Sequence, residues 1–227
     1  AAGDFENTNK NFTNVTFKVV DDVLKINPVA DEVIVTVTEN GATVTYDGTE
    51  HSVKGYKSMT ANNELYDVTT SVKATETAAW TAKGTNAGEY PVGIAAGDFE
   101  NTNKNFTNVT FNIVDGVLKI NPITENTITI TANSNEKTYD GTPLTDNGFD
   151  YTKGVLADGD VLTAVVEGSA TNVGDEGKNV VKSYKVMRGG VDVTNNYPFG
   201  ESIIGKLTVT PVAIELTAGS DSKPYDG

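Results

Sequence analysis

Cysteine is absent from this chain of 227 residues, and histidine and tryptophan each occur once. Without cysteine there are no disulfide bonds, no thiolate metal sites and no cysteine nucleophile. The single histidine, His51, cannot supply a general base or a Ser-His-Asp triad to more than one part of the chain. No apolar run approaches the length of about 18 residues that a membrane-spanning helix needs, so we expect no membrane insertion.

Positive charge is also scarce. The chain has 17 Lys and Arg against 31 Asp and Glu, which gives a formal net charge of −14. Nucleic-acid binding depends on clustered Lys and Arg that neutralise phosphates, and docking on anionic membranes needs the same clusters. We therefore expect no nucleic-acid partner and no membrane partner, and we interpret the acidic surface as a means of staying soluble.

Repetition dominates the rest of the sequence. The stretch GDFENTNKNFTNVTF occurs at 3–17 and again, unchanged, at 97–111, and residues 1–28 match 95–122 at all but a few positions. TYDG occurs at 45–48 and 138–141, and PYDG at 224–227. Alternating apolar residues lead to Pro at 24–28, 118–122 and 207–211. Such alternation predicts half-buried strands, which Pro then ends.

The phase of these signatures divides the chain at its prolines. It predicts two complete repeats, at 29–122 and 123–211, which we call the first and the second unit. Residues 1–28 are expected to be the C-terminal tail of a preceding repeat, and 212–227 the N-terminal start of a following one. The two partial repeats either lie loose or pair with a neighbouring copy through their exposed edges.

Each unit is long enough to fold by itself. The short alternating segments predict an all-β fold: tandem antiparallel, immunoglobulin-like β-sandwiches of about seven strands each, arranged in a row. A β-grasp unit with one helix is the alternative. The junctions at Pro122 and Pro211 contain no Gly/Ser-rich stretch, so the row should form a semi-rigid rod.

The Tyr-Asp-Gly element predicts a tight turn, because Gly reaches positive φ without strain and Asp bonds back to the nearby backbone. We expect its Tyr to pack at a corner of the sandwich, although a ligand-facing Tyr and Asp would fit the same motif. The turn residues in the complete units are Tyr46, Asp47, Gly48, Tyr139, Asp140 and Gly141.

Five motifs of the second unit occur in a fixed order: KTYDGTPLT (137–145), GVLADGD (154–160), TNVG (171–174), DVTNNYPF (192–199) and GKLTVTP (205–211). This order resembles the YDG/MBG-type repeats of large bacterial cell-surface and adhesin proteins. The first unit matches more loosely, with Val44 in place of the Lys and another sequence in place of GVLADGD. The resemblance implies export, an extracellular location on the bacterial surface, tandem β domains and no enzymatic activity.

Several residues suggest chemistry of their own. Trp80, Tyr66 and Tyr90 together would suit a sugar-stacking platform. The loops at 157–160 and 97–106 offer oxygen ligands of the kind that calcium takes, without an EF-hand spacing. Lys119 and Asn121 are candidates for an intramolecular isopeptide bond. The acidic pairs, such as Asp158 with Asp160, are expected to face solvent in turns.

Together these features favour a non-catalytic structural repeat, a stalk that projects a binding region from a bacterial surface and supports adhesion. Its partners would then be the neighbouring repeats, with a host or glycan ligand bound by another region and no cofactor. The alternative is that each unit weakly binds a glycan or a host protein, and that tandem copies add avidity.

Overall fold

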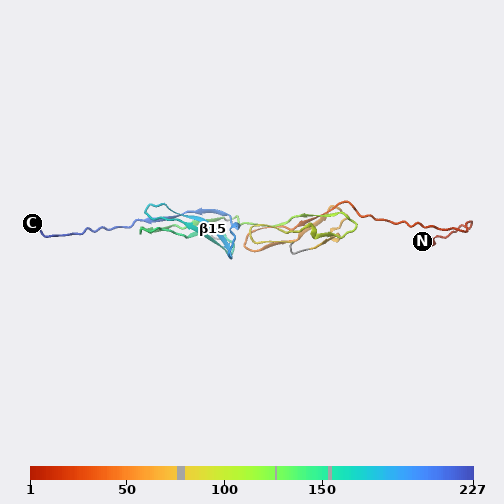
Figure 1. The fold of residues 1–227 in the computed structure, drawn as a ribbon, viewed down its shortest axis with the longest axis horizontal. Coiled ribbons are helices and arrows are strands. Elements are labelled where there is room, and N and C mark those ends of the chain that lie inside the picture. Colours follow the sequence, from red (N-terminus) through yellow and green to blue (C-terminus); the bar gives the residue numbers. More distant parts are fainter. Residues whose placement is uncertain (76–79, 126, 153–154) are drawn as a thin grey trace.

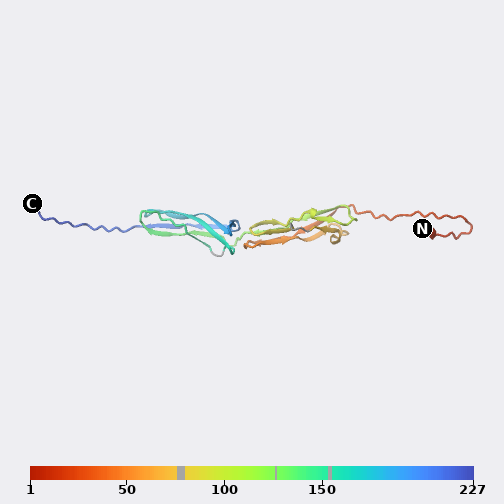
Figure 2. The ribbon, with the colours of Figure 1, turned by 60° about the horizontal axis from the view of Figure 1, so that its bottom comes forward.

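The structure is a computed structural model that describes residues 1–75, 80–125, 127–152 and 155–227. Strands make up 43% of it and helix only 6%, so the fold is all-β as predicted. Figures 1 and 2 show two folded bodies placed end to end along one long axis, with an extended segment at each outer end. None of the helices in the described part of the chain is long and apolar enough to cross a membrane.

The first unit is built from short strands arranged in two three-stranded sheets and two pairs. The sheet orders are β4-β1-β9 and β2-β10-β7, and the pairs are β3-β6 and β5-β8. The strands are β1 (Val33–Glu39), β2 (Ala42–Thr45), β3 (His51–Lys54), β4 (Tyr56–Ala61), β5 (Val72–Ala74), β6 (Thr81–Gly84), β7 (Gly88–Pro91), β8 (Phe99–Asn101), β9 (Val109–Val114) and β10 (Val117–Asn121).

The second unit has fewer and longer strands. One sheet has the order β13-β11-β17 and the other β12-β18-β15-β14, with β16 also paired to β15. The strands are β11 (Ile128–Ala132), β12 (Asn135–Thr138), β13 (Phe149–Tyr151), β14 (Asp160–Glu167), β15 (Gly177–Arg188), β16 (Val191–Asp192), β17 (Phe199–Ile203) and β18 (Gly205–Thr210).

Both units share a skeleton that is not purely antiparallel. Strand β1 pairs in parallel with β9, and β2 with β10; in the second unit β11 pairs in parallel with β17, and β12 with β18. The prediction of antiparallel sheets was wrong for these four pairs. Alternation in a sequence shows which side chains share a face, but it does not show the direction of the neighbouring strand. A chain that enters a unit at one end and leaves at the other runs its first and last strands in the same direction.

The alternating apolar residues face the interior, as their spacing predicts. In β1 the side chains of Val33, Val35 and Val37 are fully buried, and in β10 Leu118 and Ile120 are buried. The same holds for the equivalent strands of the second unit, where the buried residues are Ile128 and Ile130 in β11 and Leu207 and Val209 in β18.

Helices are few and short. Among the described residues only α1 (Val68–Ser71) is α-helical, and three single turns are 3-10 helices: η1 (Ala2–Asp4), η2 (Ala96–Asp98) and η3 (Thr194–Asn196). The side chain of Asp67 caps α1 by accepting a hydrogen bond from the backbone N–H of Thr69. A β-grasp unit would need a helix long enough to cover a sheet, and four residues are too few.

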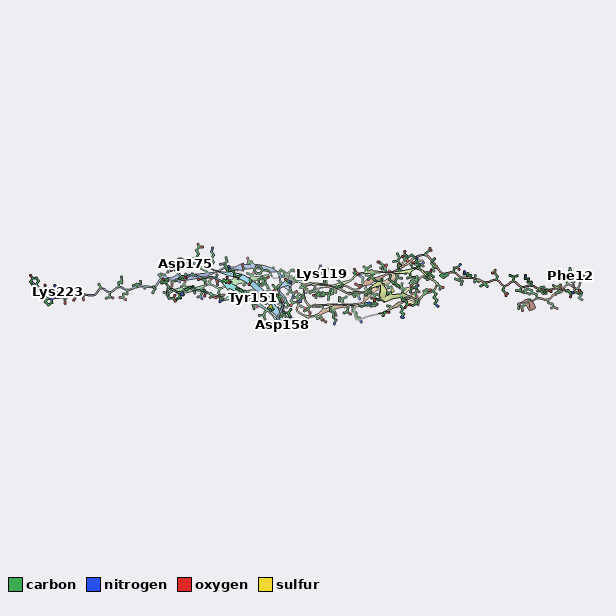
Figure 3. The ribbon with its side chains drawn as sticks, in the orientation of Figure 1. Phe12, Lys119, Tyr151, Asp158, Asp175 and Lys223 are labelled. Atoms are coloured by element: carbon green, nitrogen blue, oxygen red, sulfur yellow. The ribbon has the colours of Figure 1, made fainter. Side chains whose placement is uncertain are left out.

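The two terminal segments form no strands, although they carry the strand pattern. Leu24 and Ile26 are 89% and 83% exposed, while their equivalents Leu118 and Ile120 in β10 are buried. Ile214 and Leu216 are likewise exposed. In the complete units β10 lies between β2 and β7, and β1 and β11 lie between two neighbours. Residues 1–28 and 212–227 have no such neighbouring strands, so their backbone groups and apolar side chains face water. Figure 3 places Phe12 and Lys223 in these two segments, at opposite ends of the molecule.

Candidate functional site at the junction of the two units

The junction is the place where the two bodies of Figure 1 meet, and a Tyr-Asp-Gly turn lies in it. The turn, residues 45–49, is called here the docking turn of the first unit. Gly48 has a φ of +79°, a conformation that glycine adopts without strain. The backbone N–H of Tyr46 donates to the carbonyl oxygen of Asn121 at 2.8 Å. The turn is therefore fixed beside the last residue of β10, immediately before Pro122.

The Asp of the turn holds the loop together from within. Asp47 Oδ1 accepts hydrogen bonds from the backbone N–H of Thr49 at 2.8 Å and from its hydroxyl at 2.7 Å. His51 Nε2 lies 3.0 Å from the same oxygen. The Thr49 backbone bond, with its hydroxyl and His51 adding to it, lowers the pKa of Asp47 to about 2. His51, the only histidine, thus lies against the turn.

The tyrosine of the turn reaches into the second unit. Tyr46 is only 2% exposed, and its hydroxyl donates to Asp160 Oδ2 at 2.9 Å. Tyr197 donates its own hydroxyl to the same oxygen. The two rings meet edge to face, with their centroids 5.7 Å apart. One carboxylate of the second unit therefore joins a tyrosine from each unit.

Arg188 clamps this carboxylate and also crosses the junction. Its Nε donates to Asp160 Oδ1 at 2.6 Å, and its Nη1 donates to the carbonyl oxygen of Gly48 at 2.7 Å. Nη2 donates to the carbonyl oxygen of Asp158 at 2.7 Å, and the guanidinium lies 5.9 Å from the centre of the Tyr46 ring. Figure 3 places Asp158 at the end of the second unit that faces the first. The planar guanidinium fits this arrangement because it presents several donors in fixed directions.

A second set of contacts lies beside the first. Asn196 is 1% exposed, and its Oδ1 accepts from the backbone N–H of Ala87 at 2.6 Å, while its Nδ2 donates to Asn86 Oδ1 at 3.0 Å. Its backbone carbonyl accepts from the N–H of Ile123 at 3.0 Å. The connecting chain is thereby tied down one residue after Pro122. We call residues 157–160, 188 and 194–197 the receiving end of the second unit.

Burial around the ion pair of Asp160 and Arg188 shifts the pKa values of the residues at the junction. The Asp160 side chain is fully buried, and three donors satisfy its oxygens. Burial, with the nearby Asp160 carboxylate adding to it, raises the pKa of both Tyr46 and Tyr197. The hydrogen bond to Asp160 raises the pKa of Arg188. Both tyrosines therefore stay protonated donors, and the guanidinium keeps its charge.

The arrangement joins the two units through hydrogen bonds around one ion pair. The expectation that Asp160 faces solvent in its turn was wrong, because the first unit covers it. Its oxygens are taken by a guanidinium and two hydroxyls, so Asp160 is not free to bind calcium, whereas Asp158 of the same loop is exposed. In the described ranges no three acidic or histidine side chains are grouped closely enough to hold a metal ion.

The candidate sugar-binding residues are engaged in contacts within the first unit. Trp80 is buried, stacks on Phe99 at 5.5 Å and donates its Nε1–H to Asp98 at 2.7 Å. Tyr66 is buried too, and its hydroxyl donates to Asn101 Oδ1 at 2.8 Å. Tyr90 is half-buried in β7. Two of the three rings therefore belong to the core of the first unit and present no face to a ligand.

Lys119 and Asn121 do not meet the conditions for an isopeptide bond. The Lys119 side chain is about half exposed and pairs with Glu89 at 3.1 Å, whereas the reaction needs a desolvated lysine.

The loop at 97–106, the other candidate for calcium, uses its polar side chains in local hydrogen bonds. Asn101, for example, donates its Nδ2 to the carbonyl oxygen of Phe106 at 2.9 Å.

The sequence indicated the docking turn of the first unit but not the receiving end of the second unit. The docking turn stands out because it recurs, whereas the loop that carries Asp160 has no counterpart in the first unit, and Tyr197 is replaced there by Phe106. One signal was present: Arg188 is the only arginine in a chain that otherwise uses lysine. Arginine is the usual choice where a buried carboxylate must be held by several donors at once.

Compared with protein families, curated proteins and solved structures, the chain has no match in any of the three.

Proposed function

We propose that this chain is a stretch of tandem immunoglobulin-like β-sandwich units that acts as a non-catalytic spacer in a bacterial cell-surface protein. The spacer would hold a binding region away from the cell and so support adhesion. The observation that carries the proposal is the junction, where the Asp160 carboxylate is fully buried between tyrosines of both units. A flexible tether between two domains has no use for such a contact.

The energetics of the junction favour a fixed angle between the units. Opening it would expose a carboxylate that now has three donors and would break the bond from Arg188 to the Gly48 carbonyl. A hydrogen bond to a charged group typically contributes about 1.5–3 kcal/mol, and the junction has two that cross it, from Tyr46 to Asp160 and from Arg188 to Gly48. The apolar core is also continuous here, because Tyr46 and Tyr197 belong to the same buried cluster as Val37 and Val186.

The sandwich assignment rests on the sheets within each unit. Consecutive strands β1 and β2 belong to different sheets, and so do their partners β9 and β10. The buried faces of these strands supply one shared core. Two sheets joined by strands that pass from one to the other are the usual plan of a β-sandwich.

The extracellular location rests on the ordered motifs of the second unit, which resemble repeats of bacterial surface proteins. A cysteine-free, acidic chain is compatible with that location. The spacer would need no ligand of its own, and the neighbouring repeats would be its partners.

A measurement of the distance distribution between the units tests the proposal. Because the chain has no cysteine, Ser58→Cys and Thr163→Cys place one spin label on an exposed site of each unit. A spacer with a fixed junction should give one narrow distance distribution by double electron–electron resonance. Tyr46→Ala should broaden it, because the substitution removes a buried ring and its bond to Asp160.

Tyr139→Ala is the matched control. It removes the equivalent tyrosine from the second unit, where the side chain has no partner across a junction, and it should leave the distribution narrow. A broad distribution in the chain that carries only the two labels would rule out the semi-rigid spacer.

A further inference from the structure

The second unit carries its own docking turn, residues 138–142, and this turn repeats the geometry of the first. Gly141 has a φ of +81°. Asp140 Oδ1 accepts from the backbone N–H of Thr142 at 2.9 Å and from its hydroxyl at 2.8 Å. Lys137 Nζ binds the same oxygen at 2.8 Å, in the place that His51 takes in the first unit. The turn is therefore formed before any partner is present.

The turn also has the same position relative to the chain that leaves the unit. Tyr139 donates its backbone N–H to the carbonyl oxygen of Thr210 at 2.8 Å, as Tyr46 does to Asn121. Pro211 follows Thr210 as Pro122 follows Asn121. A folded unit that continued from Pro211 would thus meet Tyr139 in the way that the second unit meets Tyr46.

What differs is the surroundings of the tyrosine. Tyr139 is 41% exposed, whereas Tyr46 is 2% exposed. A Cβ atom at Gly141 would meet open space, whereas one at Gly48 would collide with the guanidinium of Arg188. The exposed ring and hydroxyl of Tyr139 are therefore equivalent to those of Tyr46, which at the first junction contact Asp160 and Arg188.

We propose that the docking turn at 138–142 binds the receiving end of a further unit, one that presents a buried carboxylate clamped by an arginine as Asp160 and Arg188 do. The inference rests on the proposed spacer function and names the partner of its free end. The carboxylate would accept a hydrogen bond from the Tyr139 hydroxyl, and the guanidinium would reach the carbonyl oxygen of Gly141.

The N-terminal end of the first unit is a poorer match to this turn. There Phe106 stands in the place of Tyr197, and a phenylalanine has no hydroxyl to place on a shared carboxylate. A second hydroxyl that could act as a donor, that of Tyr66, is already used in a hydrogen bond to Asn101 within the same unit. The chemistry that fits Tyr139 is therefore that of the second unit's receiving end.

Tyrosine nitration with tetranitromethane tests the proposal directly, because the chain has no cysteine to compete for the reagent. The test compares the full chain with the same chain lengthened by a second copy of residues 123–211, inserted directly after Pro211. In the full chain Tyr139 should react and Tyr46 should be protected. In the lengthened chain nitration of Tyr139 should fall roughly tenfold or more, because a docked tyrosine reacts only when the contact opens.

Two controls make the result specific. An Asp160→Ala substitution confined to the added copy should restore nitration of Tyr139, since it removes the carboxylate but leaves the original junction intact. Circular dichroism and the melting curve of the lengthened chain show whether the added copy is folded.

The possible outcomes separate the two proposals. If Tyr46 is protected but Tyr139 stays reactive in a folded, lengthened chain, the docking proposal is wrong and the spacer proposal stands. If Tyr46 itself reacts freely in the full chain, the first junction does not form in solution, and both proposals fail.

Discussion

At the scale of single residues, two glycines allow a matched comparison. Gly48 and Gly141 have φ values of +79° and +81° and occupy the same position in their turns. Adding a Cβ at such a φ costs about 1 kcal/mol in either unit. Only at Gly48 would the new atom also displace Arg188, which donates to that residue's carbonyl oxygen.

We therefore expect Gly141→Ala to lower the free energy of unfolding by about 1 kcal/mol. Gly48→Ala should lower it by roughly a further 2 kcal/mol, because a hydrogen bond from a charged group is lost as well. Urea denaturation of both variants measures the difference. Equal losses in the two variants would show that the guanidinium does not lie against Gly48.

The lowered pKa of Asp47 in the docking turn predicts that the stability of the protein falls at acidic pH. Hydrogen bonds from Thr49 lower the pKa of Asp47 from 3.8 to about 2, so between these values the unfolded chain binds more protons than the folded one. The stability that Asp47 contributes is then complete above about pH 4 and is lost as the pH falls toward 2. Melting temperatures measured from pH 5 to pH 2 follow this loss.

Asp47→Asn serves as the comparison, because asparagine keeps an acceptor oxygen for Thr49 but does not titrate. The melting temperature of this variant should fall less steeply below pH 4 than that of the unsubstituted chain. Identical acid profiles for the two proteins would mean that the Thr49 bonds do not form in solution.

At the scale of elements, one buried carboxylate holds the end of β1 against two loops. Glu39 is 3% exposed, and its two oxygens accept from the backbone N–H groups of Ile94 at 2.6 Å and Gly116 at 2.7 Å. Its position corresponds to Ala132 in β11. The second unit instead uses Asn179, whose Nδ2 donates to the carbonyl oxygens of Asn133 and Asp146.

Glu39→Ala should destabilise the first unit by about 2–5 kcal/mol, because it leaves two buried N–H groups without an acceptor. Glu32→Ala is the control: Glu32 is exposed and its carboxylate accepts a hydrogen bond from the Thr110 hydroxyl at the surface, so the change should stay within about 0.5 kcal/mol. Differential scanning calorimetry measures both. A similar small effect for the two variants would show that Glu39 is not an essential link.

The sequence predicts elements better than it predicts contacts between them. Alternation around Val35 and Val37, and around Leu118 and Ile120, was enough to place strands with the correct buried face. Parallel pairing of first and last strands could not be predicted, because it depends on how the chain crosses the whole unit. The strand pattern at Leu24 and Ile26 was misleading for a related reason: a strand needs a partner, and the pattern alone does not supply one.

Of the two sides of the candidate site, only the docking turn could be predicted from the sequence. The repeated Tyr-Asp-Gly turn indicated that something at the unit ends is kept constant, but the acceptor for its tyrosine is distant in sequence. Asp160 lies more than a hundred positions from Tyr46, and no local spacing relates the two. Only the isolated arginine at 188 distinguished the receiving end from an ordinary charged surface.

At the scale of the whole molecule, the arrangement in Figures 1 and 2 predicts a particle much longer than it is wide. A compact globule of this length would have a radius of gyration of about 17 Å. Small-angle X-ray scattering should give a clearly larger value, with a pair-distance distribution that has a long tail. A symmetrical distribution with a radius near that of the globule would contradict the end-to-end arrangement.

Trypsin treatment gives the scattering experiment its control. Lys18, Lys25 and Lys223 lie in exposed segments without strands, so trimmed chains should lose the outer tails first. Scattering from the trimmed particle then reports the two units alone, and its profile should remain elongated.

The parallel pairing of first and last strands has a mechanical consequence. When the two ends of a unit are pulled apart along the molecular axis, β1 and β9 slide past each other lengthwise, and so do β2 and β10. The hydrogen bonds of both ladders then resist the force together, whereas an antiparallel hairpin peels open one rung at a time. A unit under tension would carry the load through such pairs of strands without first unravelling its remaining strands.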